Sequence, residues 1–138
     1  KHSVLGKLLI SISIAAVLTA CSNKSDETQT KLSLADSCKQ VKEIAPKLAD
    51  GIGKAQDDPN KAKEHLDASR EALAEMVAIV SEDENLNKAT AEYGIKLASF
   101  LDALENAIAN GSGLIDPSVT PSRDAARTAG ATLDTICK

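Results

Sequence analysis

The stretch SEDENLNKATAEYGIKLASFLDALENAIANG, residues 81–111, decides the fold. Its apolar residues recur every three or four positions, which is the period of an amphipathic α-helix. The apolar positions are Leu86, Ala89, Tyr93, Leu97, Phe100, Leu101, Leu104 and Ile108. Ser81 and Glu84 have the spacing of a capping box, and Asn110-Gly111 is typical of a helix end. We therefore expect one long helix whose apolar face is covered by other helices.

A helix with the same period is expected earlier in the chain, beginning at Ser33, which can cap it, with Asp36 three residues on. Its apolar positions are Leu34, Cys38, Val41, Ile44, Ala45, Leu48 and Ile52. Pro46 lies inside this pattern and predicts a bend or a split, because proline removes a backbone donor and clashes with the preceding turn. Gly51 and Gly53 are expected to loosen the end of the helix.

Two more helices complete the predicted domain. Asp57-Asp58-Pro59 opens one that is expected to run to about Val80, since Asp is favoured at a cap and Pro at the first helical position. Its inward positions are Ala62, Leu66, Ser69, Leu73, Met76, Val77 and Val80. Thr120-Pro121 opens the other, whose inward positions are Ala126, Ala129, Leu133 and Ile136. Four amphipathic helices with short connections predict an all-α fold, an antiparallel up-down-up-down four-helix bundle over residues 33–138.

Two cysteines are placed to close this bundle. Cys38 lies in the first turns of the first predicted helix and Cys137 in the last turn of the fourth. These two ends share a pole in an up-down-up-down bundle, so we expect a disulfide between them. It would close a loop of about 100 residues, worth roughly 4–5 kcal/mol in the chain-entropy model. Two unpaired buried thiols, or a redox pair, are the alternative.

The first twenty residues have the pattern of an export signal. Lys1 and Lys7 precede an apolar run from Leu8 to Leu18, which is shorter than the roughly 20 residues that span a bilayer. The run ends in Leu18-Thr19-Ala20-Cys21, which resembles the lipobox of bacterial lipoproteins. The resemblance implies cleavage just before Cys21, a diacylglyceryl group on its sulfur and often an acyl chain on the new terminus. An uncleaved anchor and ordinary secretion are the alternatives.

The resemblance also implies an organisation and a location. Residues 1–20 are a cleaved signal peptide, and residues 21–32 are the lipidated N-terminus and a flexible linker, since Ser22 to Lys31 is polar throughout. The helical domain is expected in the cell envelope, lipid-anchored and facing the periplasm or the exterior. Ser22 is not the aspartate that retains many lipoproteins at the inner membrane, so the outer membrane is favoured in a bacterium that has one.

Composition narrows the classes of function. The sequence has 16 Lys+Arg and 20 Asp+Glu, and residues 1–20 contain two of these cations and none of the acids. An acidic domain without a basic stripe is unsuited to nucleic acid, and it gains no attraction to anionic lipid headgroups. One Tyr, one Phe and no Trp make the core aliphatic and disfavour carbohydrate stacking.

No pattern for catalysis or metal binding stands out. His65 is the one histidine after residue 20, and it lacks a second ligand or a carboxylate at helical spacing. Ser112, between Gly111 and Gly113, lacks the strand-to-helix setting of a nucleophile turn. The oxygens of Glu82-Asp83-Glu84, Asn85 and Asn87 lack the spacing of a calcium loop, so helix capping explains them better. We expect a non-enzymatic protein without a metal or a cofactor.

Two surface features are candidate contacts. Acidic residues line one face of the second predicted helix and continue just past its end, at Glu64, Asp67, Glu71, Glu75 and Glu82. A solvated surface is the simpler interpretation of this acidic stripe, and a docking face for a basic partner is the functional one. Leu114 and Ile115, in the connector 111–119, either seal the end of the bundle or form an exposed contact loop.

These observations predict an envelope lipoprotein that binds or modulates another envelope or exported protein through a helix face. The membrane is the further partner that the lipid anchor implies. The alternative is a small-ligand binder with an aliphatic cavity inside the bundle, which would suit an acyl chain.

Overall fold

The computed structural model describes residues 30–138 and contains four α-helices in this range. The helices are α3 (Leu34–Asp57), α4 (Ala62–Val77), α5 (Glu84–Ala109) and α6 (Thr120–Ile136), with short 3-10 turns η1 (Pro59–Lys61) and η2 (Gly113–Ile115). The all-helical fold is confirmed for these residues, in which an isolated bridge between Leu32 and Ser81 is the only β pairing. The predicted signal peptide, the Cys21 lipid site and most of the linker lie outside the described residues.

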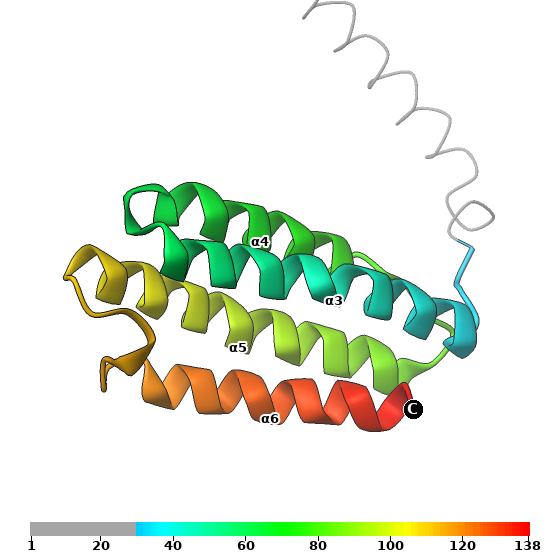
Figure 1. Cartoon of the computed structure of the whole chain (residues 1–138). Helices are drawn as coiled ribbons and strands as arrows, with labels where there is room; N and C mark the ends of the chain where they lie inside the picture. Colours follow the sequence, from blue (N-terminus) through cyan, green and yellow to red (C-terminus); the bar gives the residue numbers. More distant parts are fainter. Residues whose placement is uncertain (1–29) are drawn as a thin grey trace, which may run out of the picture. The chain divides into compact units, whose positions relative to one another are not determined.

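From top to bottom of Figure 1 the helices follow the order α4, α3, α5 and α6. The main packing pairs are α3 on α4, α4 on α5 and α5 on α6, and α3 also touches α5. The first and last helices, α3 and α6, contact each other much less than these pairs do. One core runs through the domain, and its large side chains without solvent exposure include Leu66, Leu86, Leu101 and Leu104.

The first helix begins as predicted but is not split. Ser33 is the N-cap of α3, and its Oγ accepts a hydrogen bond from the N–H of Asp36 at 3.1 Å. The helix then continues without a break through Pro46 to Asp57. Pro46 has no N–H to donate to the carbonyl of Lys42, four residues earlier. Because Pro46 is exposed, that carbonyl lies on the face of α3 where water can bind it.

The expectation that Gly51 loosens the end of α3 is wrong. Gly51 lies at a close contact between α3 and α4. It is buried, and a Cβ atom built on it would collide with Ser69 and lie 2.6 Å from the carbonyl oxygen of His65. The Ser69 hydroxyl in turn donates to the carbonyl of Leu48 at 3.0 Å. Glycine is therefore required at this position by the close approach of two helices.

The long helix α5 begins later than the capping box predicted. Asp83 is the N-cap and accepts a hydrogen bond from the N–H of Leu86 at 3.0 Å, so the expected box of Ser81 and Glu84 is wrong. Ser81 is buried, and the side-chain amide of Asn87 binds both its N–H and its carbonyl at 2.9 Å. These bonds hold Ser81 outside the helix. Asn87 and Asp83 therefore have structural roles: Asn87 binds the backbone of Ser81, and Asp83 caps α5.

The end of α5 at Asn110-Gly111 is confirmed. Gly111 has a φ of +89°, a left-handed conformation that favours glycine. The N–H groups of Gly111 and Ser112 donate to the carbonyls of Ile108 and Ala107, each at 2.9 Å. This is the Schellman arrangement, which satisfies carbonyls that a helix end would otherwise leave unpaired.

The predicted apolar faces are correct at the helix centres and wrong near several ends. Leu34 is 38% exposed, and Val77 and Val80 are each 42% exposed, whereas Ile79, which the pattern omitted, is buried. Ala45 is exposed as well. The cause in the second helix is that α4 ends at Val77 and does not reach Val80, so the chain turns and directs Ile79 inward. That helix also starts late, at Ala62 after η1, and Asp58 makes no side-chain cap bond. The last helix begins at Thr120-Pro121 as predicted.

The predicted disulfide is confirmed. Cys38 and Cys137 are bonded, with their Cα atoms 5.3 Å apart and a separation of 99 positions in the sequence. Both cysteines are buried. The bond ties the first turns of α3 to the end of α6, the two helices that otherwise touch little.

Gly51→Ala should destabilise the domain by about 1–3 kcal/mol, because the new methyl group overpacks the α3–α4 contact. Gly53→Ala is the matched control, since a Cβ at Gly53 meets nothing within 4 Å and should add roughly 0.5–1 kcal/mol of helix stability. Urea unfolding followed by circular dichroism measures both. Equal effects of the two substitutions would contradict the packing account.

Cys38→Ala combined with Cys137→Ala should lower the free energy of unfolding by about 2–5 kcal/mol, because the long loop is no longer closed in the unfolded state. Thermal unfolding measures the loss. Reduction of the unchanged chain is the control and should shift its midpoint by a similar amount. An unchanged midpoint in both cases would show that the bond adds nothing to stability.

Candidate functional site

The acidic stripe lies on α4 as predicted, except for its last member. Glu64 and Glu71 are exposed and form no ion pair with any residue that the structure describes, while Glu75 lies 3.4 Å from the ammonium group of Lys47 on α3. Glu82 is in the connection between α4 and α5 and not on the helix. On α4, the members without an ion pair in the described range are therefore Glu64, in the first turn, and Glu71, near the middle of the helix.

Arg70 joins the stripe to α5 in a charge network that sequence reasoning missed. Its guanidinium lies 2.8 Å from carboxylate oxygens of Asp67, Asp102 and Glu105. Lys63 adds a further contact to Asp67 at 2.9 Å. The available signal was the three-residue spacing of Asp102 and Glu105, which places both on one face of their helix.

The pKa values in this network shift in the directions that its contacts require. Hydrogen bonds from Lys63 and Arg70 hold the pKa of Asp67 below its usual value, and the same contact raises the pKa of Lys63. Burial alone would lower the pKa of Arg70, but the three carboxylates outweigh burial and raise it. The negative charge of Asp67 is therefore balanced by the two cations that contact it, Lys63 and Arg70.

An exposed apolar surface lies beside the stripe, between α4 and α5. We call it the α4–α5 strip; it contains Leu73, Ala74, Val77, Ala91, Gly94, Ile95 and Ala98, with Arg70 at its edge. Ile95 is 63% exposed and Val77 is 42% exposed. A Cβ atom on Gly94 would lie 2.7 Å from a methyl group of Val77, so the glycine lets the two helices approach closely here. Ala74 follows Glu71 by three positions, and the strip and the stripe are therefore neighbours on α4.

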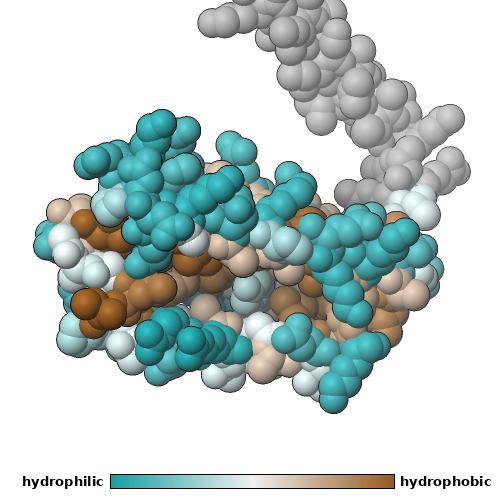
Figure 2. All heavy atoms as spheres, viewed as in Figure 1, coloured by the Kyte–Doolittle hydropathy of each residue, from teal (hydrophilic) through white to brown (hydrophobic). Residues whose placement is uncertain are grey.

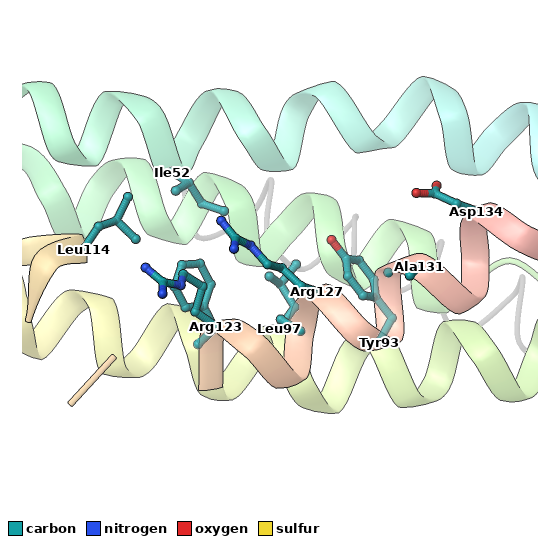
Figure 3. A pocket seen from close by; sticks show the side chains of 11 residues that line it. Ile52, Tyr93, Leu97, Leu114, Arg123, Arg127, Ala131 and Asp134 are labelled. Carbon is teal, nitrogen blue, oxygen red and sulfur yellow. The ribbon is translucent and has the colours of Figure 1, made fainter. Parts of the chain in front are cut away.

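A second apolar hollow opens on the face seen in Figure 2, where apolar residues run between polar ones above and below. We call it the α3–α6 groove, and it has a volume of about 380 Å³. Its lining is Ile52 of α3, Tyr93, Leu97 and Phe100 of α5, Leu114 of η2, and Arg123, Ala126, Arg127, Gly130, Ala131 and Asp134 of α6. Figure 3 shows Ile52 and Leu114 near one end and Tyr93 and Asp134 near the other.

Two arginines of α6 reach across this groove toward α3 (Figure 3). The Nε of Arg123 is buried without a hydrogen-bond partner, and its nearest carboxylate, on Asp124, is 3.7 Å away. Arg127 is exposed and has no ion pair within residues 30–138. At the other end, burial and, to a smaller extent, Asp134 raise the pKa of Tyr93.

Leu114 and Ile115, the two apolar residues of the connector 111–119, differ in their exposure to solvent. Leu114 is half-buried, packs against the core and closes one end of the α3–α6 groove. Ile115 is 88% exposed. Both residues lie in the 3-10 turn η2, which has three residues per turn and therefore rotates successive side chains by about 120°, so one can face the core while the next faces solvent.

The connection between α4 and α5 is hydrogen-bonded to Leu32, which lies just before α3. The N–H of Leu32 donates to the carbonyl of Val80 at 2.9 Å, and the N–H of Glu82 donates to the carbonyl of Leu32 at 2.8 Å. Ser37 adds a bond from its hydroxyl to the carbonyl of Ser33 at 2.7 Å. The start of the domain is thus bound to the α4–α5 connection at Ser81.

The remaining polar candidates have structural surroundings. The Ser112 hydroxyl lies 2.6 Å from a carboxylate oxygen of Asp116 and 3.0 Å from the carbonyl of Ala107. Hydrogen bonds from Ser112 and, next, from Ser118 lower the pKa of Asp116. His65 is half-buried on α4. Across residues 30–138, no three His, Cys, Asp or Glu side chains gather closely enough to hold a metal ion. No helix in the same range has the length and hydropathy needed to cross a bilayer.

Comparison of the chain with protein-family models, with curated proteins and with solved structures gives no match. Its function is therefore inferred from three surfaces: the acidic stripe, the α4–α5 strip and the α3–α6 groove.

Arg70→Met should lower the free energy of unfolding at neutral pH by roughly 1 kcal/mol, because three carboxylates lose a shared cation. A carboxylate whose folded pKa is depressed, like that of Asp67, contributes stability above its unfolded pKa and loses it as the pH falls through the folded value. The difference between the variant and the unchanged chain should therefore shrink below about pH 4.

Urea unfolding at several pH values measures this difference. Lys96→Met is the matched control, since it removes only an exposed contact to Glu92 at 3.7 Å and should have little effect at any pH. A difference for Arg70→Met that stays constant down to acid pH would rule out an ionic origin.

Proposed function

We propose that this chain is a non-enzymatic, membrane-anchored lipoprotein of the bacterial cell envelope that binds another envelope or exported protein through a helix face. The lipobox-like residues 18–21 support the anchor at Cys21 and cleavage of residues 1–20. The Cys38–Cys137 bond supports an oxidising compartment such as the periplasm or the exterior. In a bacterium with two membranes, the outer membrane is the proposed location.

The proposal includes the topology of the domain. We infer an antiparallel up-down-up-down bundle, because the connections between successive helices are short. The bond between the start of α3 and the end of α6 agrees with this topology, since those ends then share a pole. Under this arrangement Leu32, the disulfide and the α4–α5 connection belong to one end of the domain.

The observation that carries the binding function is the α4–α5 strip beside the acidic stripe. Ile95 and Val77 expose apolar side chains on a surface whose other members are mostly small, and such patches are typical of contact sites. A surface such as the α4–α5 strip suits the apolar face of an amphipathic helix. Glu64 and Glu71, which have no counter-ion in the described range, favour a partner helix with a basic edge.

The second candidate function is binding of an acyl chain. The observation that favours it is the α3–α6 groove, with its floor of Leu97 and Phe100. The site differs from the enclosed cavity expected from the sequence, because it is an open groove that also contains arginine side chains.

A photo-activated crosslinking amino acid in place of Ile95, in the full chain produced in cells, should crosslink to one protein species. Glu64→Lys with Glu71→Lys should reduce the yield severalfold, because the partner's basic edge would meet like charge. Crosslinking followed by mass spectrometry measures the yield and identifies the partner.

Glu43→Lys with Asp57→Lys is the matched control, since it makes the same change in charge on the exposed surface of α3. It should leave the yield unchanged. If both double variants reduce crosslinking equally, the acidic stripe has no specific role. If the Ile95 position gives no protein product at all, the proposed function is wrong.

A further inference from the structure

The α3–α6 groove lies between two features that hold its helices. Beyond its Asp134 end the Cys38–Cys137 bond joins α3 to α6, and at the other end Leu114 packs against the core. Between the ends, α6 contributes the small residues Gly130 and Ala131, so no long side chain from this part of the helix fills the space. The bottom of this apolar channel is formed by Leu97 and Phe100 of α5, which are 4% and 6% exposed.

The arginines give this channel a polarity. The chain has three arginines and 20 acidic residues, yet only Arg70 is surrounded by carboxylates. Arg123 and Arg127 lie one turn apart on α6, and Figure 3 shows Arg127 extending toward Ile52 and Arg123 toward Leu114. Asp134 is at the opposite end, beside Tyr93. An anionic group is therefore attracted to the end of the groove near Leu114 and repelled from the other.

We propose that the α3–α6 groove binds a single fatty acid, with its carboxylate on Arg123 and Arg127 and its chain along Leu97 toward Tyr93. This inference rests on the second candidate function and adds the head group and its direction. Guanidinium groups match a carboxylate in geometry and form strong charge-assisted hydrogen bonds with it. The buried Nε of Arg123 is a donor that lacks an acceptor in the protein.

The size and lining of the groove select this ligand over two others. A volume of about 380 Å³ is near the lower end for small-molecule sites, so it suits one chain better than a two-chain phospholipid. A polar solute would leave Ile52, Leu97 and Phe100 in contact with polar groups, which is unfavourable. An uncharged chain would leave Arg127 without an ion pair in the described range and the Nε of Arg123 without a charged acceptor.

Tyr93 makes the site observable. It is the one tyrosine of a chain without tryptophan, it lines the groove, and its emission therefore reports on this site alone. The full chain in phosphatidylcholine vesicles is titrated with laurate, with dodecanol, which has the same chain length without the charge, and with acetate, which has the charge without the chain. We expect saturable binding of laurate, binding of dodecanol that is about tenfold weaker, and no response to acetate.

Arg123→Gln with Arg127→Gln should weaken laurate binding by about tenfold and leave dodecanol binding unchanged. Lys61→Gln with Lys88→Gln is the matched control, because it removes two exposed cations that do not line the groove, and it should bind laurate normally. Ala131→Met should weaken the binding of both chains by narrowing the channel. Circular dichroism confirms that each variant is folded.

Three results would overturn the proposal: no saturable response to laurate, equal affinities for laurate and dodecanol, or no effect of the arginine substitutions. Failure of fatty-acid binding can be distinguished from failure of the protein-binding function. Ala131→Met should leave crosslinking at Ile95 unchanged, because position 131 lines the groove and is not part of the α4–α5 strip.

Discussion

The Cys38–Cys137 disulfide is the constraint on which the relation between α3 and α6 depends. Every other major helix contact in the described domain joins helices that follow one another or involves α5. The last helix therefore packs mainly on α5, and the covalent bond holds its far end against α3. Because the two helices are held at one end and pack little beyond it, a groove is left between them, and α5 forms its floor.

Periodicity predicted the helices well because each buries one continuous apolar face. It failed where a single contact decided the outcome. Gly51 has the composition of a flexible helix end, yet its role comes from Ser69, 18 positions away in the sequence, whose helix packs directly on it. Ser81 has the spacing of a cap, but the side chain of Asn87 binds its backbone and moves the cap to Asp83. Neither outcome is encoded in local sequence alone.

The candidate site was predictable only in part, for the same reason. Four of the five residues of the acidic stripe lie on α4, so spacing was enough to find them, and it failed only for Glu82, beyond the end of that helix. The Arg70 network and the two apolar surfaces each combine residues of different helices, and their composition depends on which helices become neighbours. Arg123 and Arg127 had no visible role in the sequence because the apolar residues beneath them belong to α3, α5 and η2.

The two apolar surfaces have different chemistry, and this difference argues for different occupants. The α4–α5 strip is bordered by acids and made mostly of small side chains, so it favours close approach of a helix with a basic edge. The α3–α6 groove contains two cations near its Leu114 end and has a volume of only about 380 Å³, so it favours one anionic chain. They share no lining residue. The two proposed occupants, a fatty acid and a partner protein, can therefore bind at once, since neither covers the residues that bind the other.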